Sequence, residues 1–503
     1  MSAVASRPTA VRVAPPLRVV GLVVGGAGLT IAAPLAYAAW LDEPLLPYAL
    51  PLALSAALFA VAYLAGRRVD APNRREALAA AVLTWVGLSA LGILPYVLGS
   101  APGGPQGVID AFFESTAGFT ATGATIITDL PAQPRALLLW RSQTQWIGGI
   151  GLIVLAVIFL PRLAVGGRQL IETEVAGPQL EKLAPHLRAS TLRIVGVYVA
   201  LTVLVIAGLT ALGAAGLAPG MGPYEAVAHA FTTVSAGGFS PSPDSIEPFG
   251  PWAQWLIAGA IIIAGTNLAL WFRAIALGRL SSFRDDELRW YLGILAVGSL
   301  VVLLELMTAG TYDLADGVRQ AVFQVASITT GTGYASADFA AWGELALITL
   351  FVLMFVGGCT GSPTGALKVM RVVLFGRVIL REIRATVHPE QVRLIRINSR
   401  PVNARIIHGV LVFVLLYVVL VLLSAVLLLV DPGAPAGLNF EDALSAAAAS
   451  VGNVGPGFGF LGPMGSYAPF ADPSKVFLAL LMIVGRLEIF PVLVVLSRAF
   501  WRD

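Results

Sequence analysis

The sequence predicts an all-α integral membrane protein in which one structural unit occurs four times, after two extra N-terminal transmembrane helices. Of the 503 residues, 57% are hydrophobic and only 12% are charged, whereas soluble proteins have about 25% charged residues. The charged side chains are too few to cover a water-facing surface, so we expect the membrane to surround the chain. Four short glycine loops recur between apolar stretches and are centred on Gly123, Gly237, Gly333 and Gly455.

Ten apolar stretches have the length of about 20 residues that a membrane helix needs. They are residues 18–40, 46–66, 77–99, 137–160, 192–216, 252–272, 290–309, 345–370, 406–430 and 476–497. After the first two, the stretches form four pairs, and each pair brackets a shorter segment that runs into a glycine loop. These half-helices are Val108–Gly118, Tyr224–Val234, Leu314–Thr329 and Phe440–Val451. The predicted unit is therefore helix, half-helix, glycine loop and helix.

Four such units on one chain predict pseudo-fourfold symmetry. The expected parts are a two-helix segment at 1–75 and four repeats at 76–165, 166–283, 284–385 and 386–503.

The distribution of charge tests this topology. With the N-terminus in the cytoplasm and ten alternating spans, 26 of the 32 Lys and Arg fall on the inner side, as the positive-inside rule expects. Both termini are then cytoplasmic. Although the isoelectric point is near 9.1, this distribution argues against binding to nucleic acid.

The outer side carries 16 of the 29 carboxylates, close to the glycine loops. A field of this sign concentrates cations at an entrance and repels anions. The alternative for any one of these acids is an ordinary solvated surface position.

The glycine loops indicate a site for a partly dehydrated cation. Glycine lets the backbone approach a ligand closely, and carbonyl oxygens brought together around an axis can replace the hydration shell of an ion. Each half-helix would direct its partly negative C-terminal end toward that ion. A single loop of this kind also fits an ordinary turn between membrane helices, but four equivalent loops favour the ion site.

Several segments together resemble one known family. They are residues 115–125, 140–151, 234–240, 330–335, 453–457 and 485–490. The resemblance covers the chain from about residue 15 to its end and is to the Trk/Ktr/HKT superfamily, nearest the Trk-type membrane subunit. It implies four fused units of helix, pore helix, filter loop and helix that carry potassium, sometimes with sodium, through a central pore.

The resemblance also implies which residues form the selectivity filter. They are Thr122, Gly123, Ala236, Gly237, Thr332, Gly333, Val454 and Gly455. Glycine at all four central positions implies a preference for potassium as the transported ion.

Residues 357–368 contain too much glycine and proline for an uninterrupted helix. One interpretation is a proline kink packed between neighbours. The resemblance implies instead a gating loop beneath the filter, with Gly357, Gly358, Gly361, Gly365 and Lys368 as its residues. Where the family usually has more glycine, this chain has Pro363, Thr364 and Ala366, which leaves the behaviour of the loop open.

Lys368 and Arg486 fall inside predicted spans, where an unpartnered charge is costly. Arg486 would oppose cation passage and anchor the loop through its carbonyls, or else pair with Glu488 or extend to the membrane surface. For Lys368, near the cytoplasmic end, extension to the surface is the favoured interpretation.

The resemblance further implies a homodimer in the bacterial plasma membrane and a cytoplasmic, nucleotide-binding regulatory subunit of the TrkA type. The basic inner segments 162–193 and 371–405 offer it a docking surface. This chain itself has no nucleotide fingerprint. We expect no cofactor, and potassium is the expected substrate.

Other function classes fit the sequence less well. A broken-helix secondary transporter is typically built from two inverted repeats, whereas four units in the same orientation are predicted here. An anion channel does not fit an acidic entrance. No convergent nucleophile, base or metal cluster indicates an enzyme. A passive channel and a symport with sodium or protons both remain compatible with the sequence.

Overall fold

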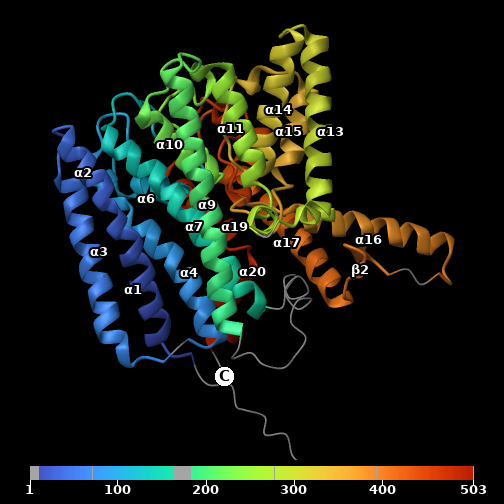
Figure 1. The fold of residues 1–503 in the computed structure, drawn as a ribbon, viewed down its shortest axis with the longest axis horizontal. Helices are drawn as coiled ribbons and strands as arrows, with labels where there is room; N and C mark the ends of the chain where they lie inside the picture. Colours follow the sequence, from blue (N-terminus) through green and yellow to red (C-terminus); the bar gives the residue numbers. More distant parts are fainter. Residues whose placement is uncertain (1–10, 71, 164–182, 277, 392–393, 502–503) are drawn as a thin grey trace, which may run out of the picture.

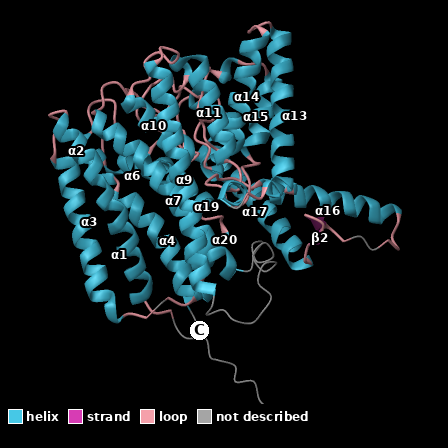
Figure 2. Cartoon of the chain, in the orientation of Figure 1, coloured by secondary structure: helices cyan, strands magenta, loops and turns pink. Residues whose placement is uncertain are grey.

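The computed structural model describes residues 11–70, 72–163, 183–276, 278–391 and 394–501. Within them the chain is mostly helical (Figure 2), with one two-stranded hairpin of β1 (Arg396–Ile397) and β2 (Arg400–Pro401). Much of the inner segment 162–193 lies outside the described residues.

The N-terminal segment forms one edge of the molecule, and the first unit lies between it and the rest (Figure 1). Their helices are α1 (Ala14–Gly28), α2 (Ala32–Trp40), α3 (Leu46–Ala65), α4 (Arg74–Leu91), α5 (Ile93–Gly99), α6 (Val108–Phe119) and α7 (Arg135–Leu163). α1 packs on α3 and α4. Trp85 and Trp140 lie in their shared core.

The second and third units follow along the chain. Their helices are α9 (Leu183–Ala214), α10 (Pro223–Val234), α11 (Gly250–Ala264), α12 (Leu268–Ala276), α13 (Asp286–Ala309), α14 (Leu314–Thr330), α15 (Glu344–Met354) and α16 (Val369–Val387). α16 projects from the body on the side opposite α1 and α3 (Figure 1).

The fourth unit repeats the pattern. It contains α17 (Ala404–Val430), α18 (Phe440–Gly452), α19 (Asp472–Arg486), α20 (Phe490–Leu496) and a last short turn, α21 (Arg498–Trp501).

The four half-helices are confirmed within one or two residues as α6, α10, α14 and α18. Their N-termini carry local signals: Asp313 and Asn439 accept backbone N–H bonds at the starts of α14 and α18, which satisfies donors that have no partner within the helix. The fold class is an all-α membrane fold, as expected.

Three predicted spans are not continuous helices, so those predictions were wrong in detail. The stretch 252–272 is a pair, α11 and α12, bent by 95°, and 476–497 is α19 and α20, bent by 113°. In 345–370, α15 ends at Met354 and a loop follows. By length and composition, six helices among the described residues can cross a membrane, or up to eight if each bent pair is one span.

The bends have local causes. Between α19 and α20, Glu488 and Ile489 have positive φ angles of 60° and 56°, which a helix cannot contain. Pro491, near the start of α20, has no backbone N–H. An apolar composition cannot reveal such breaks because the residues on both sides remain hydrophobic.

Two glycines allow outgoing helices to pack directly on half-helices. A Cβ on Gly148 of α7 would lie under 3.0 Å from the carbonyl oxygen of Phe119, at the end of α6. A Cβ on Gly485 of α19 would meet Val451 O, at the end of α18, in the same way. Phe119 and Val451 each stand four residues before a glycine-loop centre, so the two contacts are equivalent.

We predict that Gly148→Ala destabilises the protein by about 1–3 kcal/mol, because the added methyl group overpacks a backbone contact. The measurement is the midpoint of thermal unfolding in detergent. Gly259→Ala on α11 is the matched control, since a Cβ there meets nothing within 4 Å, and its midpoint should stay the same or rise. Equal midpoints for the two variants would contradict this packing.

Candidate functional site

The same backbone hydrogen bond closes all four glycine loops. In each loop an amide donates to the carbonyl oxygen five residues earlier, at 2.8 or 2.9 Å. The four donors are Thr122, Gly237, Thr332 and Val454. In each case the next residue is a glycine with a positive φ angle: Gly123, Gly238, Gly333 and Gly455. We call these four glycines the ring glycines.

In the second loop the structure moves the register by one residue. Spacing equated Gly237 with the other central glycines, but Gly238 is the residue with their backbone conformation and hydrogen-bond position. Ala236, with a φ of 54°, occupies the place of Ala121 in the first loop. The sequence Gly237-Gly238 fits the motif in either register, so spacing could not choose between them.

Contacts between the loops form a closed ring. A Cβ on each ring glycine would clash, under 3.0 Å, with the carbonyl oxygen of the residue that precedes the next ring glycine. In chain order, the four contacts are Gly123 with Gly237 O, Gly238 with Thr332 O, Gly333 with Val454 O, and Gly455 with Thr122 O. The last contact joins the fourth loop to the first, which is the predicted pseudo-fourfold arrangement.

The surroundings of the ring favour a cation. α6, α10, α14 and α18 each end a few residues before a ring glycine, so the partly negative ends of four helices lie near the ring. All four ring glycines line a cavity of about 240 Å³, which the segments after the loops also border. We call this cavity the vestibule; the topology predicted from the charge distribution would place it on the outer side.

Polar side chains hold the loops from behind. Gln145 of α7 donates to Gly237 O at 2.7 Å and accepts from the amide of Phe239 at 3.1 Å. Asn453 donates to Thr122 Oγ1 and to Met482 O, both at 2.9 Å. Neighbouring units are therefore tied to one another beside the ring.

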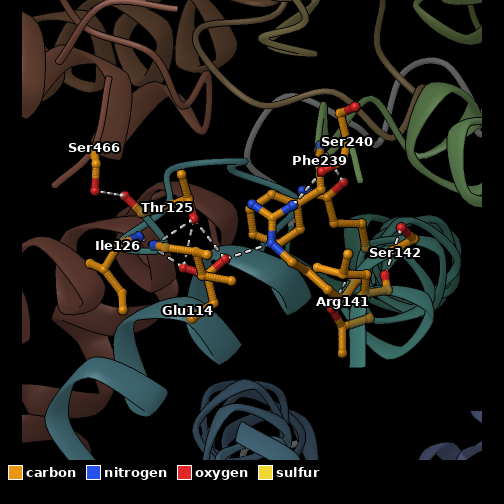
Figure 3. A network of polar contacts seen from close by, with 12 residues as sticks. Glu114, Thr125, Ile126, Arg141, Ser142, Phe239, Ser240 and Ser466 are labelled. Atoms are coloured by element: carbon orange, nitrogen blue, oxygen red, sulfur yellow. Dashed lines mark hydrogen bonds and ion pairs between the residues drawn. The ribbon is translucent and has the colours of Figure 1, made fainter. Parts of the chain in front are cut away.

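A buried ion pair lies beside the vestibule (Figure 3). Arg141 Nε donates to Glu114 Oε1 at 2.6 Å, and the two side chains are only 3% and 0% exposed. Glu114 also accepts from the amide of Ile126 at 2.9 Å and from Thr125 Oγ1 at 3.0 Å. Charge pairs out of water are stable only with such added hydrogen bonds.

The four basic residues of the predicted outer side all have acidic partners. Besides Arg141 with Glu114, they are Arg135 with Glu225, Arg319 with Asp316, and Lys475 with Asp110. Each of these bases pairs with one acid, so the predicted outer side keeps its surplus of acidic residues.

On the other side of the ring, the broken span forms a compact loop between α15 and α16. Gly357 and Gly361 have φ angles of 78° and 87°. The Gly358 amide donates to Thr364 Oγ1 at 3.1 Å. A Cβ on Gly365 would clash with Gly452 O, next to the fourth glycine loop. The segment is a folded loop against the ring rather than a kinked helix.

Arg486 contacts this loop directly. Its Nη1 donates to Pro363 O at 2.8 Å and its Nη2 to Gly148 O at 3.2 Å, and the residue is 2% exposed. The alternative pair with Glu488 does not form, because Glu488 accepts from Arg371 at 2.5 Å. Burial likewise excludes extension to the membrane surface.

Lys368 is also directed into the loop, so the favoured interpretation that it extends to the surface was wrong. Its Nζ donates to Ser362 O at 3.1 Å and to Thr364 O at 2.7 Å, and the residue is 7% exposed. With Arg486 on Pro363 O, two cations bind three consecutive carbonyls. These peptide oxygens satisfy the amino group inside the protein.

Sequence reasoning missed an anchor for this loop. Glu287, buried near the start of α13, accepts at one oxygen from Thr360 N at 2.7 Å, Thr360 Oγ1 at 3.0 Å and Met370 N at 3.2 Å. The signal that could have revealed Glu287 is a carboxylate at the edge of a predicted span. Arg141 and Gln145, which hold the glycine loops, gave a similar signal as polar residues within an otherwise apolar stretch.

Comparisons with known proteins identify the family of this chain. Residues 52–502 match the family model TrkH, described as a cation transport protein. The chain is 35% identical to the Trk system potassium uptake protein TrkH of Halomonas elongata, over 97% of this chain and 98% of that protein. Its identity to the protein of the same name from Escherichia coli K12 is 34%, over 88% and 91%.

A solved structure is similar as well. The crystal structure of the potassium transporter TrkH from Vibrio parahaemolyticus superposes with a TM-score of 0.83 at 31% identity, over 97% of this chain and 99% of that one. The chain therefore belongs to the TrkH family of cation transport proteins.

Proposed function

We propose that this protein is a transporter that takes up potassium across the bacterial plasma membrane, as the membrane subunit of a Trk-type system. The closed ring of glycine–carbonyl contacts is the observation that carries the proposal. The names of its relatives, Trk system potassium uptake proteins, give the ion.

The ring is the selectivity filter. Its carbonyls belong to the four ring glycines and to the residues before them, Thr122, Gly237, Thr332 and Val454. Ala236 lies directly before Gly237. Oxygens arranged around one axis replace the water that a potassium ion loses. The vestibule supplies ions from the acidic outer side. The basic residues of that side are paired with acids, so they do not strongly repel an entering cation.

The loop at 357–368 is the gate. Gly357, Gly358, Gly361 and Gly365 let it fold against the ring, while Lys368 and Arg486 hold its carbonyls. Two buried positive charges below the filter oppose the passage of a third cation. For the gate to open, the loop must therefore separate from the side chains of Lys368 and Arg486, or the loop and these side chains must move together.

The protein works as a homodimer in membrane lipid, with both termini in the cytoplasm and a cytoplasmic, nucleotide-binding regulatory subunit. Its two-helix segment covers 1–75, and its four units cover 76–165, 166–283, 284–385 and 386–503.

The filter proposal makes a prediction that depends on register. Expressed in bacteria that lack potassium uptake, the wild type should restore growth at low potassium and take up rubidium. Gly238→Ala and Gly455→Ser should abolish both, because each added side chain clashes with backbone and requires a strained positive φ. Gly237→Ala should retain measurable uptake, since the three atoms nearest to its Cβ all belong to the side chain of Gln145 rather than to backbone.

Membrane abundance of each variant is the control. Normal growth and uptake by Gly238→Ala and Gly455→Ser at wild-type abundance would refute the filter.

The gate makes a separate prediction. Arg486→Gln should raise the maximal rate of rubidium uptake about tenfold, because it removes a positive charge and a charged hydrogen bond of about 1.5–3 kcal/mol from the closed loop. Lys475→Gln, which removes a cation from the outer end of the same helix, should leave the rate near the wild-type value. If Arg486→Gln is fully abundant and transports at the wild-type rate, Arg486 is not part of the barrier.

A further inference from the structure

The buried pair Glu114–Arg141 breaks the fourfold symmetry around the ring. Glu114 stands nine residues before its ring glycine, and the same place in the other units holds His229, Gln324 and Ala446. The four units thus share backbone geometry at the ring, but only the first has a charged residue at this place.

All four units use this region for the same task, which is to hold the chain as it leaves the ring. His229 Nε2 lies 3.0 Å from Ser240 Oγ. The side-chain amide of Gln324 accepts from the Ser336 N–H at 2.7 Å and donates to Tyr334 O at 3.2 Å. In the fourth unit, Ser445 Oγ accepts from the amide of Phe458 at 2.9 Å. These contacts join each half-helix to its own loop and are neutral.

The contact in the first unit extends further. Glu114 holds Thr125 and Ile126 of its own loop, while Arg141 donates from Nη1 to Ser240 O of the second loop at 3.0 Å. The guanidinium also lies 3.4 Å from the centre of the Phe239 ring. Figure 3 shows the pair between these two loops. One buried ion pair therefore connects the exits of two neighbouring loops.

We propose that Arg141, held by Glu114, is a positioning residue that sets the discrimination between monovalent cations at the boundary of the first and second loops. The proposal deepens, and rests on, the proposed function of the ring as a filter. A carbonyl cage distinguishes ions by the placement and field of its oxygens. Shifting Ser240 moves a chain segment only two residues from Gly238.

The pair has a second consequence for the vestibule. Arg141 lines this cavity, where a lone positive charge would repel incoming cations. Glu114 neutralises it at 2.6 Å. Removal of the carboxylate alone therefore affects ion entry, whereas removal of the guanidinium affects the position of the second loop. The two residues are separable by experiment.

The test measures rubidium and sodium uptake by the full-length protein in potassium-uptake-deficient bacteria. Arg141→Gln should lower the ratio of rubidium to sodium uptake about tenfold, which corresponds to about 1.4 kcal/mol. Glu114→Gln should raise the KM for rubidium, and the double variant Glu114→Gln/Arg141→Gln should return KM toward the wild-type value while the ratio stays low. If the pair had only a structural role, the variants would be less abundant in the membrane. They would not separate into one that changes the KM for rubidium and one that changes the ratio of rubidium to sodium uptake.

Arg135→Gln is the matched control. Arg135 is on the same helix and pairs with Glu225 of α10 at 3.6 Å, but the pair is at the exposed outer end, so ratio and KM should be unchanged. If Arg141→Gln does not accumulate in the membrane, Arg141→Lys gives the same comparison, because lysine keeps the charge but lacks the fork that reaches both Glu114 and Ser240.

An unchanged ratio in an abundant Arg141→Gln or Arg141→Lys variant overturns the proposal. The filter itself is judged separately: if Gly455→Ser abolishes uptake while the ratio of the Arg141 variants stays at the wild-type value, the filter stands and only the positioning role fails. If the wild type takes up no rubidium, the proposed function fails first.

Discussion

The structure depends on the absence of side chains at four points. Each ring glycine faces a carbonyl oxygen of the next loop so closely that a Cβ has no room, and each has a positive φ. Either condition alone favours glycine; together they require it. The contacts run in chain order and return from the fourth loop to the first, so each loop packs closely against both of its neighbours.

This constraint explains the architecture around it. Loops without regular hydrogen bonding survive at membrane depth only where protein or a water-filled cavity satisfies their polar groups. The half-helices supply the common backbone bond, and Gln145 and Asn453 supply side-chain bonds from neighbouring elements. Close packing at Gly148 and Gly485 brings outgoing helices to the ends of two half-helices.

Buried charges occur on both sides of the ring and differ in character. On the vestibule side, Glu114 and Arg141 neutralise one another. On the other side, Lys368 and Arg486 bind peptide carbonyls of a loop, so their positive charge is solvated but not cancelled. In the proposed mechanism the neutral Glu114–Arg141 pair lets cations enter the vestibule, whereas the positive charges of Lys368 and Arg486 stop cations from passing beyond the ring. Membrane proteins keep such costly residues where they serve the pathway.

Much of this could be predicted from the sequence. Apolar length located the helices, and the half-helices were correct within two residues because each is delimited by polar or glycine residues. The bends at Gly265–Asn267 and at Glu488 were not predictable, since hydropathy does not change across them. Register in the second loop failed because Gly237 and Gly238 are chemically identical, and only the backbone distinguishes them. The direction of Lys368 failed because a sequence cannot show that loop carbonyls lie within its reach.

The most direct test of the central claim is the anomalous diffraction of crystals in which rubidium or thallium replaces potassium. If the ring is the filter, a peak lies on the axis of the ring, surrounded by the carbonyl oxygens of Thr122, Gly237, Thr332 and Val454. Peaks found only in the vestibule or elsewhere, with none at these oxygens in a well-ordered ring, would contradict it.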